Sequence, residues 1–250
     1  MIKNSFQILL SENSEELPPV LEKATESFKQ CFSYCSYKFY NKDMIEEFLK
    51  FEFEEDVLKA FNKLKPKAFK KDLASYCIAY KYGGWYADIT IKFIKNININ
   101  NTGIEFLGFM DVGNGVRPNT LPYPVQTSLF YANKGSKIMN RAIKLIVEHC
   151  KKEYYGLTST SPTGPGVLGR AIAYNGLESN QIVGHFMPLT PNHRNQNRSY
   201  ILPDGSIVAL HKDAWFPKAQ PADLSAFGIS DSDNYLEMCK KKDIYNKEIN

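Results

Sequence analysis

Asp88 and Thr90 have the side chains and the spacing that best suit chemistry on a charged group. They lie in the decapeptide WYADITIKFI, whose alternation predicts a strand with both side chains on one face. A carboxylate and a second oxygen in this arrangement suit a hard cation such as Mg²⁺ or Mn²⁺. Such a cation neutralises the charge on a departing diphosphate. Because Thr90 carries no charge, we expect metal binding to be poor without nucleotide.

A helix is predicted just before this strand. Apolar side chains recur with helical spacing over residues 69–80, which predicts one buried stripe, and Asp72 and Ser75 lie on another face. Gly83 and Gly84 follow, as glycine does where a helix needs a left-handed cap. The chain then turns directly into the predicted strand.

The remaining elements alternate between strands and helices, which predicts a single α/β domain over residues 1–250. We expect strands within 6–10, 104–110, 125–132, 200–202 and 207–210, and helices from residue 17, twice within 43–64, after Ser136 and over 167–173. Residues 117–124 and 163–166 are predicted loops. Residues 203–205 (Pro-Asp-Gly) predict a hairpin turn that leaves His211 at a strand end.

Residues 71–92, KDLASYCIAYKYGGWYADITIK, closely resemble the core of family 32 glycosyltransferases. This family includes bacterial capsule and lipopolysaccharide sugar transferases, yeast mannosyltransferases and the glucosylating domains of large clostridial toxins. The matching positions are Asp72, Tyr76, Tyr80, Gly83, Gly84, Tyr86 and Asp88. Two positions depart from the pattern: Ser75 stands in place of an arginine, and Thr90 in place of the second aspartate of Asp-x-Asp.

Weaker similarity extends along the chain. Residues 6–8, with Gln7 at the centre, resemble the first strand of the family, and 163–165 resemble its Thr-Gly-Pro loop. His211 and Trp215 resemble the C-terminal elements that fold over the pyrophosphate. We therefore expect His211 and Trp215 to lie beside Asp88 in space.

The resemblance implies a GT-A-like fold, with one Rossmann-like mixed sheet flanked by helices. It also implies a UDP- or GDP-sugar donor, retention of anomeric configuration, and a polysaccharide or lipid-linked glycan acceptor. The implied donor-binding residues are Gln7, Asp72, Ser75, Gly83, Gly84, Tyr86, Asp88 and Trp215. The implied ligands of Mn²⁺ or Mg²⁺ are Asp88, Thr90 and His211. Asp88 and Asp111 are the candidate catalytic residues, Asp111 for positioning the acceptor, and Thr163 and Gly164 form the candidate acceptor loop.

Several alternatives stay open. Asp72 also suits stabilisation of a helix N-terminus, Tyr86 and Trp215 also suit core packing, and His211 also suits a structural role. Because Ser75 and Thr90 depart from the family pattern, a nucleotide-sugar-binding protein with impaired catalysis is an alternative function. A toxin-like effector that glycosylates a host protein is another.

Composition limits the other function classes. The 250 residues carry a net charge of +4, from 31 basic and 27 acidic residues, too small a surplus to indicate nucleic-acid binding. The N-terminus is too polar for a signal peptide, and no apolar run suits a membrane span, so we expect a cytoplasmic protein. Lysines crowd 63–71 and 240–242, for which we expect a solvated face, with peripheral contact to anionic membrane as the alternative. Cys31 and Cys35 are predicted to be reduced thiols on one helix face.

Overall fold

The computed structural model describes residues 3–12, 16–99, 102–112, 123–176, 178–190 and 197–247. Its strands are β1 (Lys3–Ile8), β2 (Cys35–Tyr40), β3 (Gly84–Ala87), β4 (Lys92–Phe93), β5 (Phe106–Asp111), β6 (Leu129–Ala132), β7 (Gln181–Pro188), β8 (Arg198–Ile201) and β9 (Ile207–Leu210). Its α-helices are α1 (Pro19–Cys31), α2 (Lys42–Glu52), α3 (Glu55–Lys63), α4 (Lys67–Tyr82), α5 (Lys137–Lys152), α6 (Pro165–Asn175), α7 (Lys212–Trp215) and α8 (Tyr235–Lys240). The predicted loop at 117–124 lies, up to residue 122, outside the described residues.

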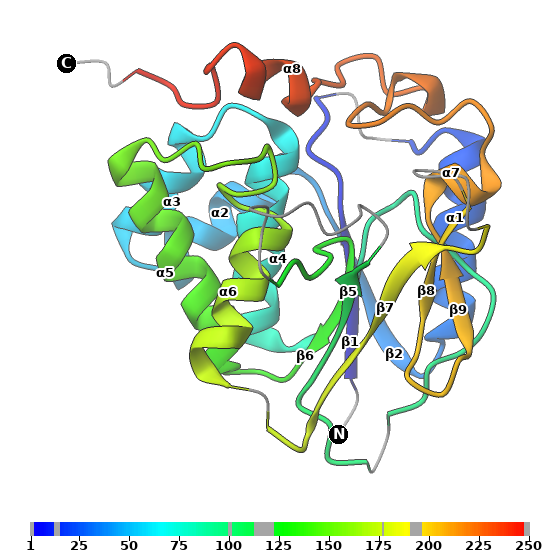
Figure 1. Ribbon diagram of the computed structural model, residues 1–250. Helices are drawn as coiled ribbons and strands as arrows, with labels where there is room; N and C mark the ends of the chain where they lie inside the picture. The colour runs from blue at the N-terminus through cyan, green and yellow to red at the C-terminus, as the bar shows by residue number, and fades with distance from the viewer. Residues whose placement is uncertain are drawn as a thin grey trace.

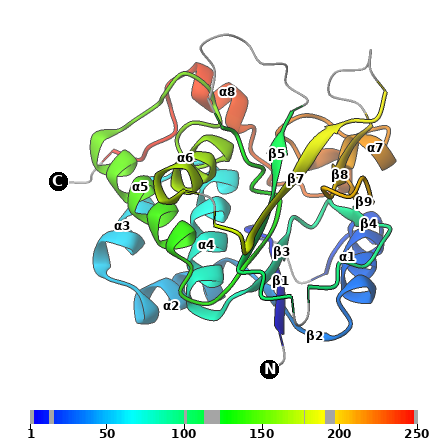
Figure 2. The same ribbon diagram turned by 60° about the horizontal axis from the view of Figure 1, so that its bottom comes forward.

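All the strands of the described chain form one mixed sheet in the order β2-β1-β3-β6-β5-β7-β8-β9-β4. The pairs β1–β2, β1–β3 and β5–β7 are parallel, and the other neighbours are antiparallel. Although β4 follows β3 in the chain, it pairs with β9 at the far edge of the sheet. Helices α2 to α6 lie on one side of the sheet and α1 on the other, as Figures 1 and 2 show. The predicted mixed α/β sheet flanked by helices is confirmed.

The core has two main parts, one on each side of the sheet. Helix α1 packs Phe28 and Phe32 against Phe93 of β4 and Trp85 of β3. On the other side, α4 is packed among the sheet and neighbouring helices, and its buried residues include Asp72 and Ser75. The predicted single buried stripe is therefore too narrow. The burial of α4 on several faces brings charged side chains into the interior.

The predicted strand over WYADITIKFI is wrong in one respect, because the chain turns at its centre. Strand β3 ends at Ala87, and the backbone N–H of Ile91 donates to the carbonyl oxygen of Asp88 at 3.0 Å. Strand β4 then begins at Lys92 on the opposite edge of the sheet. A chain that leaves the centre of a sheet for its far edge cannot continue the same strand, so Asp88 and Thr90 do not share a strand face.

Other predictions fare unevenly. Two helices do lie within 43–64, and the hairpin at 203–205 joins β8 to β9. Cys31 ends α1 whereas Cys35 begins β2, so they do not share a helix face, although all five cysteines are free thiols. The strand predicted over 125–132 is shortened to β6, and β2 and β7 were not predicted. No helix within the described ranges has the length and apolar character to cross a membrane.

Candidate active site

A cavity of about 440 Å³ opens beside the carboxyl-terminal ends of β1, β3 and β5. Asp88 follows β3, Asp111 ends β5, and Gly164 precedes α6, so three connections meet there. The segment 221–236 contributes Asp223 and Tyr235 to another wall. In Figure 1 this C-terminal part runs across the top of the molecule, over the strand ends. The cavity is therefore enclosed by segments that are distant in sequence.

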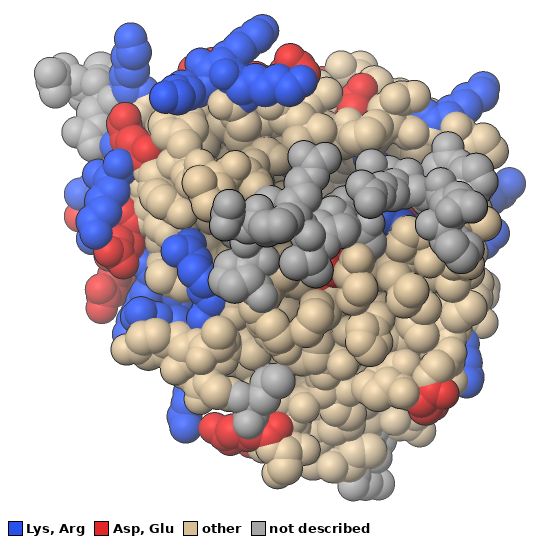
Figure 3. Space-filling model, viewed as in Figure 1, with Lys and Arg blue, Asp and Glu red and all other residues tan. Residues whose placement is uncertain are grey.

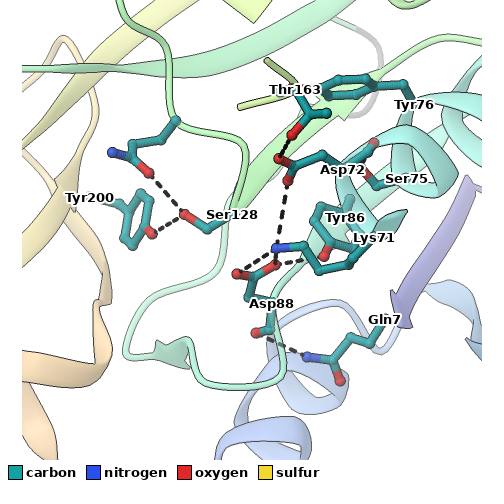
Figure 4. Close-up of polar contacts among 11 residues, drawn as sticks. Gln7, Lys71, Asp72, Ser75, Tyr76, Tyr86, Asp88, Ser128, Thr163 and Tyr200 are labelled. Atoms are coloured by element: carbon teal, nitrogen blue, oxygen red, sulfur yellow. Dashed lines mark hydrogen bonds and ion pairs between the residues drawn. The ribbon is translucent and has the colours of Figure 1, made fainter. Parts of the chain in front are cut away.

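Asp88 is held by both its backbone and its side chain. Its backbone N–H donates to the carbonyl oxygen of Ser128 at 2.8 Å, which fixes the end of β3 against the neighbouring segment. Its carboxylate accepts hydrogen bonds from Lys71 Nζ, at 2.8 Å to Oδ1 and 3.0 Å to Oδ2, and from Tyr86 Oη at 2.6 Å to Oδ1. Figure 4 shows these contacts converging from α4 and β3. The carboxylate, 23% exposed, is thus positioned at the cavity wall.

Lys71 lies between two carboxylates. Its Nζ is 3.7 Å from Asp72 Oδ1, in addition to its contacts with Asp88, and its side chain is 18% exposed. Burial alone would lower the pKa of Lys71, but the attraction of Asp88 and Asp72 outweighs burial and raises the pKa. The ammonium therefore stays charged at neutral pH.

Asp72 is almost fully buried behind Lys71. Its Oδ2 accepts a hydrogen bond from Thr163 Oγ1 at 2.9 Å, and the Thr163 carbonyl accepts one from Tyr76 Oη at 3.2 Å. Burial raises the pKa of Asp72 to about 6, against the opposing effects of Lys71 and the Thr163 hydroxyl. The Thr-Gly-Pro loop is thereby joined to α4.

A second group of basic side chains also lines the cavity. Arg198 forms an ion pair with Asp213, and His211 Nδ1 lies 3.1 Å from Asp213 Oδ2. Burial lowers the pKa of His211, so its imidazole is neutral at neutral pH. Lys212 Nζ donates to the carbonyl oxygen of Asp223 at 2.9 Å, and burial lowers its pKa to about 8. Arg198, His211 and Lys212 all line the same cavity as Asp88.

The predicted site residues fall into two sets. Those that line the cavity are Asp72, Asp88, Thr90, Asp111, Gly164 and His211. Those placed outside its described lining are Gln7, Ser75, Gly83, Gly84, Tyr86, Thr163 and Trp215. Asp111 accepts a hydrogen bond at Oδ2 from Gln126 Nε2 at 2.6 Å, which orients it at the wall. Six of the predicted residues therefore share one space.

Ser75, Gly83 and Gly84 have structural positions that account for them without a donor. Ser75 is fully buried and its hydroxyl donates to the carbonyl oxygen of Asp72, one turn earlier in α4. Gly83 caps α4 with φ 68°, and Gly84 begins β3, at the opposite end from Asp88. A Cβ on Gly84 would lie 2.3 Å from the carbonyl oxygen of Asn4, so glycine permits the close approach of β1. Direct donor contact by these three residues is not supported.

Gln7, Tyr86 and Trp215 act one layer behind the cavity. Gln7 is fully buried, and its Nε2 lies 3.4 Å from the carbonyl oxygen of Asp88. The indole Nε1 of Trp215 donates to the carbonyl oxygen of Thr90 at 3.0 Å, and Tyr86 donates to the Asp88 carboxylate. These residues hold the turn that contains Asp88 and Thr90. Trp215 therefore reaches this turn from far along the chain, as the resemblance implied.

The residues present do not fit the predicted metal site. Within the described chain, no group of three or more His, Cys, Asp or Glu side chains is arranged to hold a metal ion. Asp88 is already bonded through both carboxylate oxygens to Lys71, and Thr90 is a buried residue of the turn. Asp88, Thr90 and His211 supply one charged ligand for a divalent cation, which is weak by the standards of such sites.

Sequence reasoning did not single out Lys71, Arg198 or Lys212 as site residues. The lysines of 63–71 were predicted to be solvated, but Lys63 pairs with Glu153, Lys67 with Asp231 and Lys71 with Asp88. The one available signal was the position of Lys71, directly before Asp72. Arg198 and Lys212 reach the cavity only through tertiary folding, so no local pattern identifies them.

Comparison with known proteins agrees with the site. Residues 18–106 match the family described as "Glycosyltransferase sugar-binding region containing DXD motif". An uncharacterised glycosyltransferase of Acanthamoeba polyphaga mimivirus is 28% identical over 181 residues, which cover 65% of this chain and 68% of that protein. The match to the family includes Asp72 and Asp88 and spans about a third of the chain.

Two solved structures show low similarity. The PaToxG glycosyltransferase has a TM-score of 0.48 and 13% identity, covering 70% of each chain. A glycosyltransferase involved in the glycosylation of the major capsid of PBCV-1 has a TM-score of 0.41 and 12% identity, covering 74% of this chain and 82% of that one.

The sequence matches and the cavity together define the class of this protein: it is a glycosyltransferase. Within that class it is similar to the family 32 enzymes, and residues 18–106 match the model of a DXD-type sugar-binding region. The second acidic position of that motif is Thr90 in this chain. The predicted recognition of the family is thereby confirmed.

Proposed function

We propose that this enzyme transfers a sugar from a UDP- or GDP-sugar to a glycan or lipid-linked acceptor, with retention of configuration, in a single GT-A-like domain. The observation that carries the proposal is the convergence of Asp88 and three basic side chains, Lys71, Arg198 and Lys212, on one cavity. DXD-type glycosyltransferases generally use a nucleotide-sugar and a divalent metal.

The charges suit a diphosphate donor. A departing nucleoside diphosphate gains negative charge, and fixed cations in a partly enclosed site stabilise that charge more strongly than they would in water. Lys71, Arg198 and Lys212 all line the cavity. Asp72 and Asp88 then orient Lys71 and provide oxygens for sugar hydroxyl groups.

Asp111 and the loop at Thr163 and Gly164 are proposed to face the acceptor. Asp111 is oriented by Gln126, and Gly164 lines the cavity beside Asp72. In a retaining reaction on one face of the donor, the leaving phosphate takes the proton of the acceptor hydroxyl. Asp111 is then a positioning residue for that hydroxyl.

Lys240, Lys241 and Lys242 support peripheral contact with an anionic membrane, which suits a lipid-linked acceptor. All three are exposed at the end of α8, and Figure 3 shows basic side chains gathered along this edge of the molecule. Electrostatic attraction of this kind depends on anionic headgroups. Sedimentation with anionic and with neutral vesicles tests it, and equal binding to both would refute it.

Donor hydrolysis and transfer by the Asp88→Asn variant test the main proposal. Asparagine keeps the shape and accepts the Tyr86 hydrogen bond, but it removes the charge that holds Lys71. We expect turnover of a panel of UDP- and GDP-sugars to fall by on the order of a hundredfold. Asp56→Asn is the matched control, because Asp56 lies on α3 with its side chain 40% exposed.

Four outcomes separate the functions. Wild-type turnover with loss in Asp88→Asn supports a transferase at this site. Nucleotide binding without turnover in the wild type would favour the nucleotide-sugar-binding protein with impaired catalysis. That alternative is based on the departure of Ser75 and Thr90 from the family pattern. Near wild-type turnover in Asp88→Asn would overturn the site assignment, and transfer to protein alone would favour the toxin-like effector.

A further inference from the structure

We propose that Lys71 takes the place of the divalent cation at Asp88, so that an ammonium group of the chain itself bridges Asp88 and the donor diphosphate. This inference rests on the proposed nucleotide-sugar donor and deepens it. It reassigns Asp88 from metal ligand to partner of Lys71.

The contact between Lys71 and Asp88 occupies the position that a bridging cation needs. Nζ lies 2.8 Å from Oδ1 and 3.0 Å from Oδ2, and Tyr86 Oη lies 2.6 Å from Oδ1 (Figure 4). A metal ion bound to these oxygens would lie beside the Nζ ammonium, and the two positive charges would repel each other unless Nζ moved away. That movement would also separate Lys71 from Asp72, a carboxylate that is almost fully buried.

Lys71 retains a donor for a ligand. An ammonium group carries three N–H donors, and the two carboxylate oxygens of Asp88 accept two of these hydrogen bonds. Asp72 Oδ1, at 3.7 Å, is within ion-pair range but beyond hydrogen-bond range. The third donor is therefore available to a diphosphate oxygen that enters the cavity, where Lys71 lines the wall.

The presence of Thr90 and the presence of Lys71 compensate each other in formal charge. Two carboxylates with one divalent cation sum to zero, and one carboxylate with one ammonium also sum to zero. The exchange of the second aspartate for Thr90 removes one negative charge, and Lys71 in place of a divalent ion removes one positive charge. Both changes leave the local charge the same.

Nucleotide binding measured by calorimetry tests the inference. UDP and GDP are titrated into the wild type and into Lys71→Met, first in EDTA and then in Mn²⁺. Methionine keeps an unbranched stem of similar length and removes the charge. We expect the wild type to bind with the same affinity, within about twofold, in both conditions, and Lys71→Met to bind roughly tenfold to a hundredfold more weakly in EDTA.

Rescue by metal is the diagnostic result. With Nζ removed, the Asp88 carboxylate becomes available to a metal ion. Mn²⁺ should therefore restore part of the nucleotide affinity of Lys71→Met, whereas it should not increase the nucleotide affinity of the wild type. Lys152→Met on α5 is the control, since Lys152 is 69% exposed and should bind as the wild type does. Lys71→Arg keeps the charge and should retain metal-independent binding. Thermal unfolding confirms that each variant is folded.

The outcomes that overturn the inference are specific. Wild-type binding that requires Mn²⁺ would show that a metal holds the diphosphate, and wild-type affinity of folded Lys71→Met in EDTA would show that Lys71 does not. Binding of neither nucleotide to the wild type in either condition would overturn the proposed donor and this inference with it. Loss of free Mn²⁺ in electron paramagnetic resonance, beyond that caused by nucleotide alone, reports metal uptake independently of activity.

Discussion

Replacing Asp72 with asparagine should remove a pH dependence of stability that the wild type shows between about pH 4 and about pH 6. Burial raises the pKa of Asp72 from 3.8 to about 6, so in this window the folded protein keeps a proton that the unfolded chain has lost. Stability therefore falls as pH rises through the window, and levels off above the folded pKa. Asparagine resembles the protonated carboxyl group and has no proton to lose.

The magnitude follows from the two pKa values. The interval between 3.8 and about 6, at about 1.36 kcal/mol for each pH unit, gives on the order of 3 kcal/mol. Asp72 is 5% exposed, so solvent screening reduces this figure little. Relative to Asp72→Asn, the wild type should thus lose on the order of 3 kcal/mol between about pH 4 and about pH 7.

Urea unfolding of both proteins at several pH values measures this difference. Asp204→Asn is a control of opposite sign, because the backbone N–H of Ser206 holds the pKa of Asp204 below its usual value. Its hydrogen bond stabilises the wild type above the unfolded pKa and is lost as pH falls. The result to compare is the difference in free energy of unfolding between the wild type and Asp72→Asn. If this difference stayed constant from about pH 4 to about pH 7, or changed with pH in the same direction as for Asp204→Asn, burial would not be what sets the pKa of Asp72.

Two further predictions concern Tyr86, which contacts Asp88, and Lys212, which lines the cavity. Tyr86→Phe removes the hydroxyl that donates to Asp88 but leaves the ring packed. The free energy of unfolding, measured by urea titration, should therefore fall by about 1 kcal/mol. A loss above about 3 kcal/mol would indicate disturbed packing instead. Lys212 has a pKa lowered to about 8 by burial, so nucleotide affinity should fall as pH rises from about 7 to about 9. Calorimetry on Lys212→Met should show that dependence lost, and its persistence would point to another group.

Local signals account for the parts of the fold that were predictable. The end of α4 follows from Gly83, whose positive φ suits glycine, and the hairpin follows from Pro-Asp-Gly at 203–205. By contrast, Ile89 and Ile91 alternate with Asp88 and Thr90 although they lie in a turn. Both isoleucines are buried because the chain crosses the interior there, and burial of this kind imitates the period of a strand.

The candidate site divides in the same way. Asp72 and Asp88 belong to a motif on consecutive elements, α4 and β3, so their spacing in sequence reveals them. Lys71 was visible but was grouped with neighbouring lysines, because charge runs usually face solvent. Arg198 and Lys212 come from β8 and α7, which are far from α4 in the sequence. Their sequence separation leaves no periodicity to detect.

The N-terminal turn of α4 connects the charge of the site to the segment that encloses it. The backbone N–H of Lys67 donates to Asp233 Oδ2 at 2.7 Å, and Lys67 Nζ pairs with Asp231. Lys67 and Lys71 are one helical turn apart, so the residue that anchors segment 221–236 and the residue that holds Asp88 move as one body. A displacement of that segment would therefore have to break the Lys67 contacts, whereas the pairing of Lys71 with Asp88 lies within α4 and β3.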